Sequence, residues 1–167
     1  MRTHAEFRVS VTKDYLVFAA AHFITFSGHR YEPLHGHNYR VGIVLEGTLD
    51  PESSYVVDFS VVKTLMRRLC DEIDHRVILP LRNPRLTIVT HDGSVSVALD
   101  GKPRYVFPVE DCAMLDIPNT TVEMLAQYLL GRVRTELSGP EAEQITAVEL
   151  EVEENFGQSA ICRERLV

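Results

Sequence analysis

The 167-residue sequence predicts an α+β fold, in which a four-stranded, mainly antiparallel sheet carries two helices on one face. Segments near both ends of the chain alternate apolar and polar residues, as half-buried β-strands do. Two segments between them carry apolar residues at helical spacing, and a hairpin-like segment separates the two helices. The length fits a single domain that spans residues 1–167.

The N-terminal half of the sheet is predicted from two long alternations. The first strand is expected at about residues 6–24 and the second at about residues 35–49. Residues 27–34 contain Gly and Pro and are expected to form the loop between these strands. The alternating apolar residues are Phe7, Val9 and Val11 in the first strand and Tyr39, Val41, Ile43 and Leu45 in the second.

The first helix is predicted to begin after Asp58 or Ser60, because either side chain can cap a helix N-terminus. Apolar residues then recur every four positions up to the expected helix end near Asp74 and His75, which predicts a stripe packed on the sheet. The residues of this stripe are Val61, Leu65, Leu69 and Ile73.

The second helix is predicted to begin at Thr120 or Thr121, because Thr120 and Glu123 have the spacing of a capping box. The sequence Ser-Gly-Pro at residues 138–140 is expected to end it. The apolar face of this helix consists of Val122, Leu125, Ala126, Leu129, Leu130 and Val133.

An inserted β-hairpin is expected between the helices, at about residues 86–105. Its turn is predicted at His91-Asp92-Gly93-Ser94, and only one of its faces is apolar, which favours an insertion over a core element. The last two strands are expected at residues 145–154 and 159–166.

Composition limits the possible function classes. Hydrophobic residues make up 45% of the chain, enough for a packed core, and no segment approaches the roughly 20 apolar residues of a membrane span. The first residues lack an apolar signal-peptide core, and the three cysteines are widely spaced, so a cytoplasmic protein without disulfides is expected. A net charge of −7 argues against general nucleic-acid binding but leaves room for a small anionic substrate.

Three histidines form the strongest candidate site. His35 and His37 lie two residues apart at the start of a predicted strand, so their side chains point to the same face. His22 in the first strand offers a third imidazole, and three imidazoles with one open position are typical of a catalytic zinc centre. The alternative is that each is an ordinary hydrogen-bonded histidine.

Three further places carry candidate acids and bases. Asp74 can orient the imidazole of His75 for proton transfer, although histidine is also common at a helix C-terminus. Glu32 precedes His35 by three residues and is a candidate general base, a metal ligand or a solvated loop residue.

Glu154 interrupts an alternation of acidic and apolar residues. It continues the apolar face of its strand, whereas Glu149, Glu151 and Glu153 share the other face. A carboxylate on an apolar face needs a partner, and a ligand with two adjacent N–H donors would satisfy it. The alternative is that the strand ends there and Glu154 lies in solvent.

Taken together, these motifs resemble those of the 6-pyruvoyl-tetrahydropterin synthase and 6-carboxy-tetrahydropterin synthase family over residues 18–160. The resemblance implies the tunnelling fold, in which subunits assemble into trimers and hexamers, strands of neighbouring subunits form a barrel, and active sites lie at subunit interfaces. The matching segments are FAAAH, HGHNY, VVDFSVVK, IDH, NTTVE and VEEN.

The resemblance also implies roles for individual residues. The family's pattern places zinc on three histidines, proton transfer on an Asp–His pair and pterin binding on a late glutamate and on the start of the second helix. In this sequence the corresponding zinc ligands are His22, His35 and His37, the proton-transfer pair is Asp74 and His75, and the pterin-binding residues are Glu154, Thr121 and Glu123.

One departure from the family pattern concerns the reaction. Pyruvoyl and carboxy types carry a cysteine a few residues before the HGH motif, but here Arg30 and Tyr31 occupy those positions and Glu32 follows. This resembles the type III variant, whose glutamate replaces the cysteine and which cleaves 7,8-dihydroneopterin triphosphate to 6-hydroxymethyl-7,8-dihydropterin, a folate precursor. A second departure is the inserted hairpin, which is longer than is usual in the family.

The expected function is therefore a zinc-dependent lyase that uses a retro-aldol reaction on a pterin side chain. One alternative is a 6-carboxy-tetrahydropterin or 6-pyruvoyl-tetrahydropterin synthase with a non-cysteine base; the carboxy type would belong to queuosine biosynthesis. Another is a pterin-binding homologue without activity.

Overall fold

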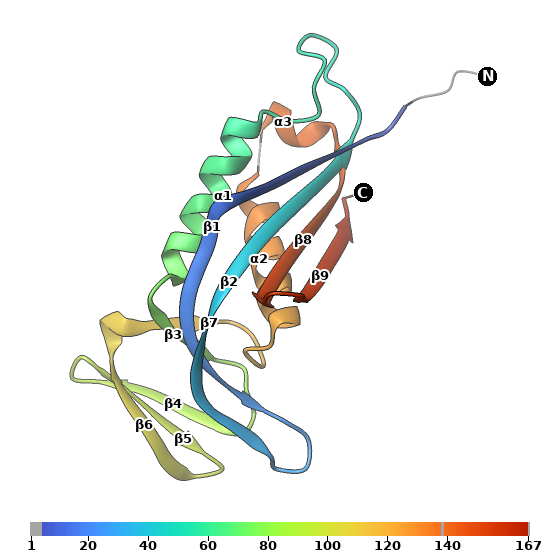
Figure 1. Cartoon of the computed structure of the whole chain (residues 1–167). Helices are drawn as coiled ribbons and strands as arrows, with labels where there is room; N and C mark the ends of the chain where they lie inside the picture. The colour runs from blue at the N-terminus through green and yellow to red at the C-terminus, as the bar shows by residue number, and fades with distance from the viewer. Residues whose placement is uncertain (1–4, 138, 167) are drawn as a thin grey trace.

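The computed structural model describes residues 5–137 and 139–166, which form two β-sheets and three helices. The strand order is β7-β3-β1-β2-β8-β9 in the larger sheet and β4-β5-β6 in the smaller one (Figure 1). The strands are β1 (Phe7–Thr25), β2 (Tyr31–Gly47), β3 (Arg76–Pro80), β4 (Leu86–His91), β5 (Ser94–Leu99), β6 (Lys102–Pro108), β7 (Cys112–Leu115), β8 (Ile145–Asn155) and β9 (Gln158–Arg165). The helices are α1 (Phe59–Ile73), α2 (Val122–Glu136) and α3 (Pro140–Glu143), with a short 3-10 turn at Val109–Asp111.

The predicted four-stranded antiparallel sheet is confirmed as β1, β2, β8 and β9, in which every neighbouring pair is antiparallel. Two short strands that the sequence did not predict, β3 and β7, extend it in parallel beside β1. They are only 5 and 4 residues long, which is too short for an alternation to stand out. The larger sheet is therefore mixed, and the fold is α+β as expected.

The start of β2 differs from the prediction. The strand begins at Tyr31, so the second half of the expected loop is strand. His22 faces His35 and Ile24 faces Glu32, which leaves two residues of β2 opposite the single residue of β1 between them. This β-bulge explains how a proline at position 33 fits inside a central strand, because a bulge tolerates the missing N–H donor.

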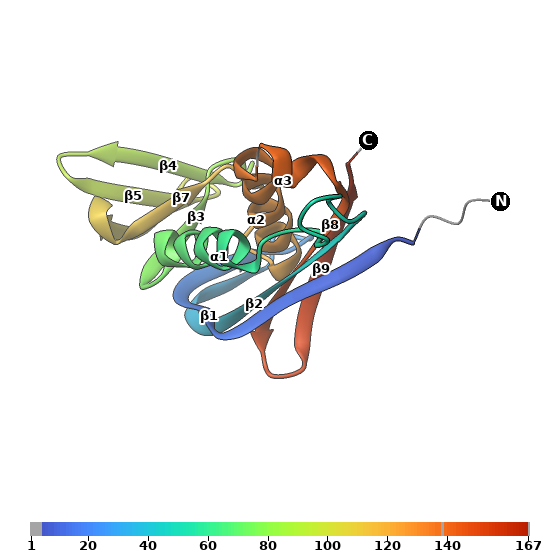
Figure 2. The same cartoon turned by 90° about the horizontal axis from the view of Figure 1, so that it is seen from above.

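α1 and α2 lie on the same side of the curved sheet (Figure 2). α1 packs against β1, and α2 packs against β8 and β9. None of the helices in the described part of the chain is long and apolar enough to cross a membrane. The core between helices and sheet includes Phe18, Tyr39, Ile43 and Leu150 from the strands and Leu65, Met66, Leu129 and Val133 from the helices.

The N-terminus of α1 is capped by Asp58, whose carboxylate accepts a hydrogen bond from the Ser60 N–H at 2.6 Å. The predicted apolar stripe is wrong at its first position. Val61 is 41% exposed, whereas Val62 is 1% exposed and packs in the core. The other residues of the predicted stripe, Leu65, Leu69 and Ile73, are buried.

α2 begins as predicted, but the capping box does not form. Thr121 is the N-cap residue and makes no capping bond with its side chain. The buried hydroxyl of Thr120 faces β1 instead and donates to the Phe23 carbonyl at 2.6 Å. Gly139, with φ of 89°, follows the end of α2 as predicted; Ser138, also part of the predicted stop, lies outside the described residues.

The insertion is a three-stranded sheet rather than a hairpin. The predicted hairpin exists as β4 and β5, and β6 adds a third strand that ends at Pro108. Along β3, Ile78 points into the helix-covered core, whereas Leu79 on the other face packs with Val95 and Val97 of the inserted sheet. The insertion therefore packs on a second, small core that it shares with β1, β3 and β7, at the end of the larger sheet where β1 and β2 turn (Figure 1).

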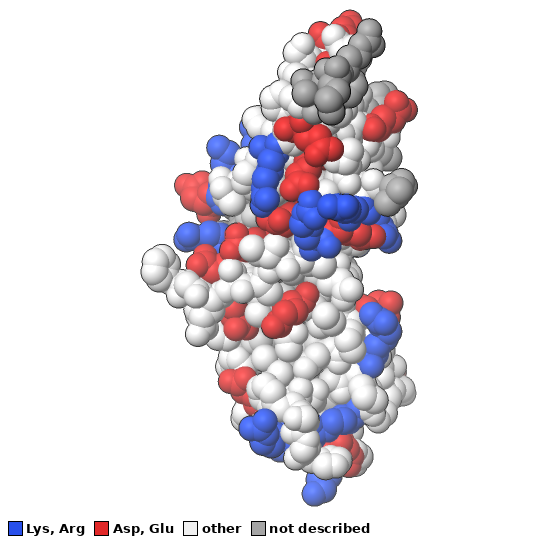
Figure 3. All heavy atoms as spheres, turned by 90° about the vertical axis from the view of Figure 1, so that its right-hand side faces the viewer, with Lys and Arg blue, Asp and Glu red and all other residues white. Residues whose placement is uncertain are grey.

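The sheet face that α1 and α2 leave uncovered is charged along β1, β2, β8 and β9. Arg8 pairs with Glu149 at 2.5 Å and with Glu46 at 3.7 Å, and Arg163 also pairs with Glu46. Figure 3 shows basic and acidic side chains next to one another in one band on the side of the molecule where β9 lies. The acidic alternation of β8 is therefore balanced by arginines on neighbouring strands.

Two adjacent valines of α1 test its orientation, because Val62 is buried and Val61 is exposed. Val62→Ala should lower the free energy of unfolding by about 2 kcal/mol, because two buried methyl groups are lost and a cavity remains. The control, Val61→Ala, should change it by less than about 0.5 kcal/mol, since this side chain is largely exposed. Denaturant unfolding measures both; equal losses would contradict the orientation of α1.

Candidate metal centre

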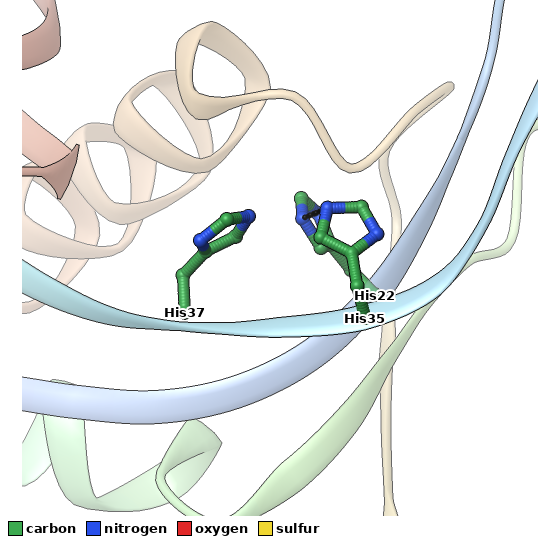
Figure 4. Close-up of side chains that lie close together, drawn as sticks. All are labelled: His22, His35 and His37. Atoms are coloured by element: carbon green, nitrogen blue, oxygen red, sulfur yellow. Dashed lines mark hydrogen bonds between the residues drawn. The ribbon is translucent and has the colours of Figure 1, made fainter.

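Three imidazoles converge on the helix-covered face of β1 and β2 (Figure 4). His22 on β1 pairs directly with His35 on β2, and His37 stands opposite Ala20, whose small side chain leaves space. The ligand nitrogens of the three rings all lie within 4.8 Å of one another. The start of α2 lies across from them, so the rings occupy a gap between sheet and helix (Figure 4).

Hydrogen bonds determine which ring nitrogens are available. The Nδ1 of His22 lies 2.9 Å from the Thr120 carbonyl, and the Nδ1 of His35 lies 2.7 Å from the Pro33 carbonyl. A carbonyl oxygen only accepts, so both Nδ1 atoms carry protons and both Nε2 atoms of the neutral rings present lone pairs. Carbonyl partners of this kind orient the histidine ligands of metals.

The two Nε2 atoms lie 3.1 Å apart. Two lone pairs that face one another at this distance repel unless a proton or a cation lies between them. Two nitrogens bound to one tetrahedral zinc ion at about 2.0–2.1 Å would be about 3.3 Å apart. The donor set, its tautomers and its spacing therefore fit a divalent metal.

Burial favours the neutral form of His22. The side chain is fully buried, and this burial lowers its pKa, with further lowering by the nearby rings of His35 and His37. The Thr120 carbonyl and the Glu154 carboxylate act in the opposite direction but do not reverse the shift. Neutral imidazole is the form that binds metals, so burial keeps His22 in the protonation state that a metal would require.

Glu154 lies beside the histidines, on the face that the alternation along β8 predicted. Its Oε1 is 3.4 Å from the Nε2 of His22 and 3.7 Å from the Nε2 of His37. The buried Tyr39 hydroxyl donates to the same oxygen at 3.4 Å. The side chain of Glu154 is 17% exposed, so the alternative of a solvated strand end is wrong.

Tyr39 is a site residue that sequence reasoning assigned only to the core. Burial raises its pKa, and the neighbouring Glu154 raises it further, so the hydroxyl stays protonated and donates. A signal was present in the sequence: Tyr39 follows His37 by two residues and therefore shares its face.

Glu32 reaches the metal centre because of the bulge in β2. Three residues separate it from His35, and in a regular strand that spacing would place the two side chains on opposite faces. The extra residue in the bulge reverses this, so Glu32 shares the face of Ile24, its partner on β1, and of His22. Its Oε1 lies 3.8 Å from the Nε2 of His35.

Asp74 and His75 are joined to each other and to β1. The His75 Nδ1 lies 2.9 Å from the Asp74 carboxylate, which also accepts from the Ala19 N–H at 2.7 Å. Burial opposes ionisation of Asp74, but the hydrogen bonds from Ala19 and His75 outweigh it and lower the pKa. The His75 side chain is 83% exposed, and within the described chain no hydrogen bond or ion pair joins it to the three histidines.

The start of α2 is tied to β1 by residues that sequence reasoning missed. The Asn119 side chain accepts from the Thr25 N–H at 3.3 Å and donates to the Thr25 carbonyl at 2.9 Å. Thr120, the next residue, supplies the carbonyl that orients His22. Thr121 is half-buried and Glu123 is exposed in the first turn, without a side-chain contact to the histidines among the described residues.

A sheet covered on one face by two helices, with three converging imidazoles that could hold a metal ion and a half-buried carboxylate beside them, defines an α+β protein with an enzyme-like site. The model of the 6-pyruvoyl tetrahydropterin synthase family matches residues 10–165. The chain belongs to this family.

Proteins of similar sequence support the same family assignment. A Methanocaldococcus jannaschii protein, provisionally named 6-carboxy-5,6,7,8-tetrahydropterin synthase, is 33% identical over 151 residues, which cover 90% of this chain and 91% of the relative. A Pyrococcus furiosus protein named dihydroneopterin monophosphate aldolase is 36% identical over 59 residues, or 35% of this chain and 48% of the relative.

Solved structures show the same fold. The 6-pyruvoyl tetrahydropterin synthase of Plasmodium falciparum has a TM-score of 0.90 and 31% identity, over 96% of this chain and 99% of the other. The Plasmodium vivax enzyme, solved with a glutamate described as a catalytic residue replaced by alanine, has a TM-score of 0.89 and 29% identity, over 97% and 99%. The tunnelling fold implied by the sequence motifs is thereby confirmed.

The metal centre predicts a loss of binding in one histidine variant. His35→Ala should weaken zinc binding by more than about 100-fold, because a direct ligand is removed. His91→Ala, which changes an exposed histidine in the inserted sheet, is the control and should bind zinc as the wild type does. Metal analysis after dialysis measures both. Equal zinc content in His35→Ala and the wild type would contradict the assignment.

Proposed function

We propose that this protein is a zinc-dependent lyase that cleaves the side chain of 7,8-dihydroneopterin triphosphate and releases 6-hydroxymethyl-7,8-dihydropterin. The observation that carries the proposal is the position of Glu32, a carboxylate on the same face as the histidines where family members of the pyruvoyl and carboxy types use a nearby cysteine. The catalytic glutamate of the Plasmodium vivax relative and the aldolase name of the Pyrococcus furiosus relative support it.

His22, His35 and His37 would hold the zinc ion, since their ligand nitrogens lie within 4.8 Å of one another and three imidazoles with an open position are typical of such a centre. When bound, zinc polarises oxygen ligands and lowers the pKa of a hydroxyl group. The carbonyls of Thr120 and Pro33 keep two of the rings in the tautomer that can bind it.

Glu32 acts as the base in this proposal. A carboxylate is a much weaker base than a thiolate, so it suits an acidified hydroxyl better than a carbon acid. Glu32 takes the proton from the hydroxyl on the second side-chain carbon, whose carbonyl then forms as the bond to the first side-chain carbon breaks. The electron pair of that bond passes to the first carbon and the conjugated pterin ring, and a proton then completes the hydroxymethyl product. The other product is a two-carbon aldehyde that keeps the triphosphate.

Asp74 and His75 are the proposed proton-transfer pair, and Glu154 is the proposed anchor of the pterin ring. Its carboxylate accepts from the 2-amino group and N3–H of the ring, while the Tyr39 hydroxyl fixes its orientation. Thr121 and Glu123, at the start of α2, belong to the same proposed pocket.

We also propose that the protein assembles into trimers or hexamers with active sites at subunit interfaces. Two strand edges support this. β9 has only β8 as a neighbour among the described strands, and β3 pairs with β1 only at Ala20 and Ala21, which leaves the N-terminal half of β1 open. Open edges of this length are templates for pairing with another chain. Assembly would also bring the exposed His75 of one subunit to the metal centre of another.

A cytoplasmic role in folate synthesis is consistent with this reaction. The product has the hydroxymethyl group of a folate precursor, and Cys70, Cys112 and Cys162 are all free thiols.

One competing reaction has a specific observation in its favour. The Methanocaldococcus jannaschii relative is provisionally named for 6-carboxy-tetrahydropterin synthesis, the chemistry of queuosine formation. Mass analysis of the pterin released from 7,8-dihydroneopterin triphosphate separates the reactions. A carboxy or pyruvoyl product would overturn the proposal, and pterin binding without turnover would identify a non-catalytic homologue.

Glu32→Ala should lower kcat by at least about 100-fold while zinc stays bound, because the base is lost and the three histidines remain. Glu52→Ala, in the exposed turn after β2, is the matched control and should retain wild-type turnover. Steady-state kinetics and metal analysis measure the two effects. Wild-type turnover in Glu32→Ala would exclude it as the base, and loss of zinc would make it a ligand.

The assembly is expected to be visible in solution. Sedimentation of the purified protein should give the mass of a trimer or hexamer, because pairing of β9 with the open half of β1 satisfies both edges. A monomer at micromolar concentration would contradict the interface.

A further inference from the structure

We propose that Tyr105 of the inserted sheet is a positioning residue that holds Glu32 toward the metal centre. The inference rests on the proposed role of Glu32 as base. In this inference the inserted sheet stabilises the bulge in β2 from the face opposite to the histidines.

The face of the sheet on which Glu32 lies depends on the bulge in β2. Pro33 and Leu34 together stand opposite Phe23, and only this extra residue brings Glu32 to the same face as His35. If the bulge were lost by a one-residue slip, Glu32 would turn to the opposite face. Contacts elsewhere in the structure must therefore stabilise the bulged register relative to the regular one.

Tyr105 contacts β2 on both sides of Glu32. Its hydroxyl accepts a hydrogen bond from the Leu34 N–H at 3.1 Å and shares a second hydrogen bond with the Tyr31 hydroxyl. Tyr31 immediately precedes Glu32, and Leu34 follows it by two residues. Because Tyr31 and Leu34 both pack with the core of the inserted sheet, Glu32 between them is directed to the other face.

The ring of Tyr105 is itself held in place. Its centroid lies 5.4 Å from the ring of Phe23 and 5.5 Å from that of Phe107, with which it stacks. The guanidinium of Arg104, the preceding residue, lies 4.8 Å from the centroid of Tyr31. The hydroxyl therefore projects from a rigid aromatic cluster rather than from a mobile loop.

A second contact holds the turn that leads into β2. Arg85, which pairs with Asp100 at 2.7 Å, donates to the backbone carbonyls of Phe26, His29 and Arg30. The inserted sheet thus fixes both the turn before Glu32 and the bulge after it. The metal ligands lie on the regular side of the bulge, where β1 alone sets their pairing.

Tyr105→Phe tests the proposal, because it removes the hydroxyl and keeps the packed ring. In the proposed reaction kcat should fall about tenfold, because the hydrogen bonds of this hydroxyl to Leu34 and Tyr31 are lost, with KM and zinc content unchanged. Amide exchange at Leu34 should accelerate, whereas exchange at Val41 should not. Tyr128→Phe, which removes a hydroxyl bonded to Arg132 on α2, is the matched control and should leave kcat unchanged.

The Glu32→Ala background separates positioning from general stability. If Tyr105 acts through Glu32, adding Tyr105→Phe to Glu32→Ala should cause no further loss of turnover. A full tenfold loss in that background, or a wild-type kcat in the single variant, would overturn the inference. Wild-type turnover in Glu32→Ala alone would instead overturn the proposed function, so the two failures are distinguishable.

Discussion

The register between β1 and β2 is the constraint on which the core and the metal centre both depend. Phe18 stands opposite Tyr39, and their rings stack at 4.6 Å inside the core. Two residues further along β1, Ala20 faces His37, and two further again His22 faces His35. Because side chains alternate with a period of two, one register sets both the end of the apolar core and the start of the polar site. Stability of the core therefore also holds the imidazoles together.

Tyr39 and Glu154 form the boundary between these two regions. Tyr39 belongs to the core by its ring and to the site by its hydroxyl. A carboxylate so close to the core would be unfavourable without a partner, and the Tyr39 hydroxyl donates to Glu154 at 3.4 Å. Its side chain stays 17% exposed, so part of the carboxylate is still open to the surroundings.

Local patterns in the sequence predicted the features that depend on one element at a time. The four long strands, the two helices, the shared face of His35 and His37 and the inward position of Glu154 all follow from periodicity. The features that the local sequence patterns did not predict depend on contacts between distant segments. Thr120 bonds to β1 instead of forming its capping box, β3 and β7 form because β1 offers an edge, and the bulge near Glu32 is bound by Tyr105. The family resemblance supplied the candidate roles, but not the geometry that brings Glu32 to the histidines.

The bulge divides β2 into two parts that meet at Pro33. On one side His35 and His37 depend on pairing with β1 and on the Pro33 carbonyl; on the other, Glu32 depends on the inserted sheet. In the proposed reaction a glutamate takes the place of a shorter and more basic cysteine, so the backbone at this position has to direct it to the histidines. Pro33 belongs to the bulge and its carbonyl orients His35, so the bulge serves the nearest histidine as well as Glu32. The hydrogen bonds of Tyr105 to Tyr31 and Leu34 therefore hold the piece of backbone on which both Glu32 and His35 depend.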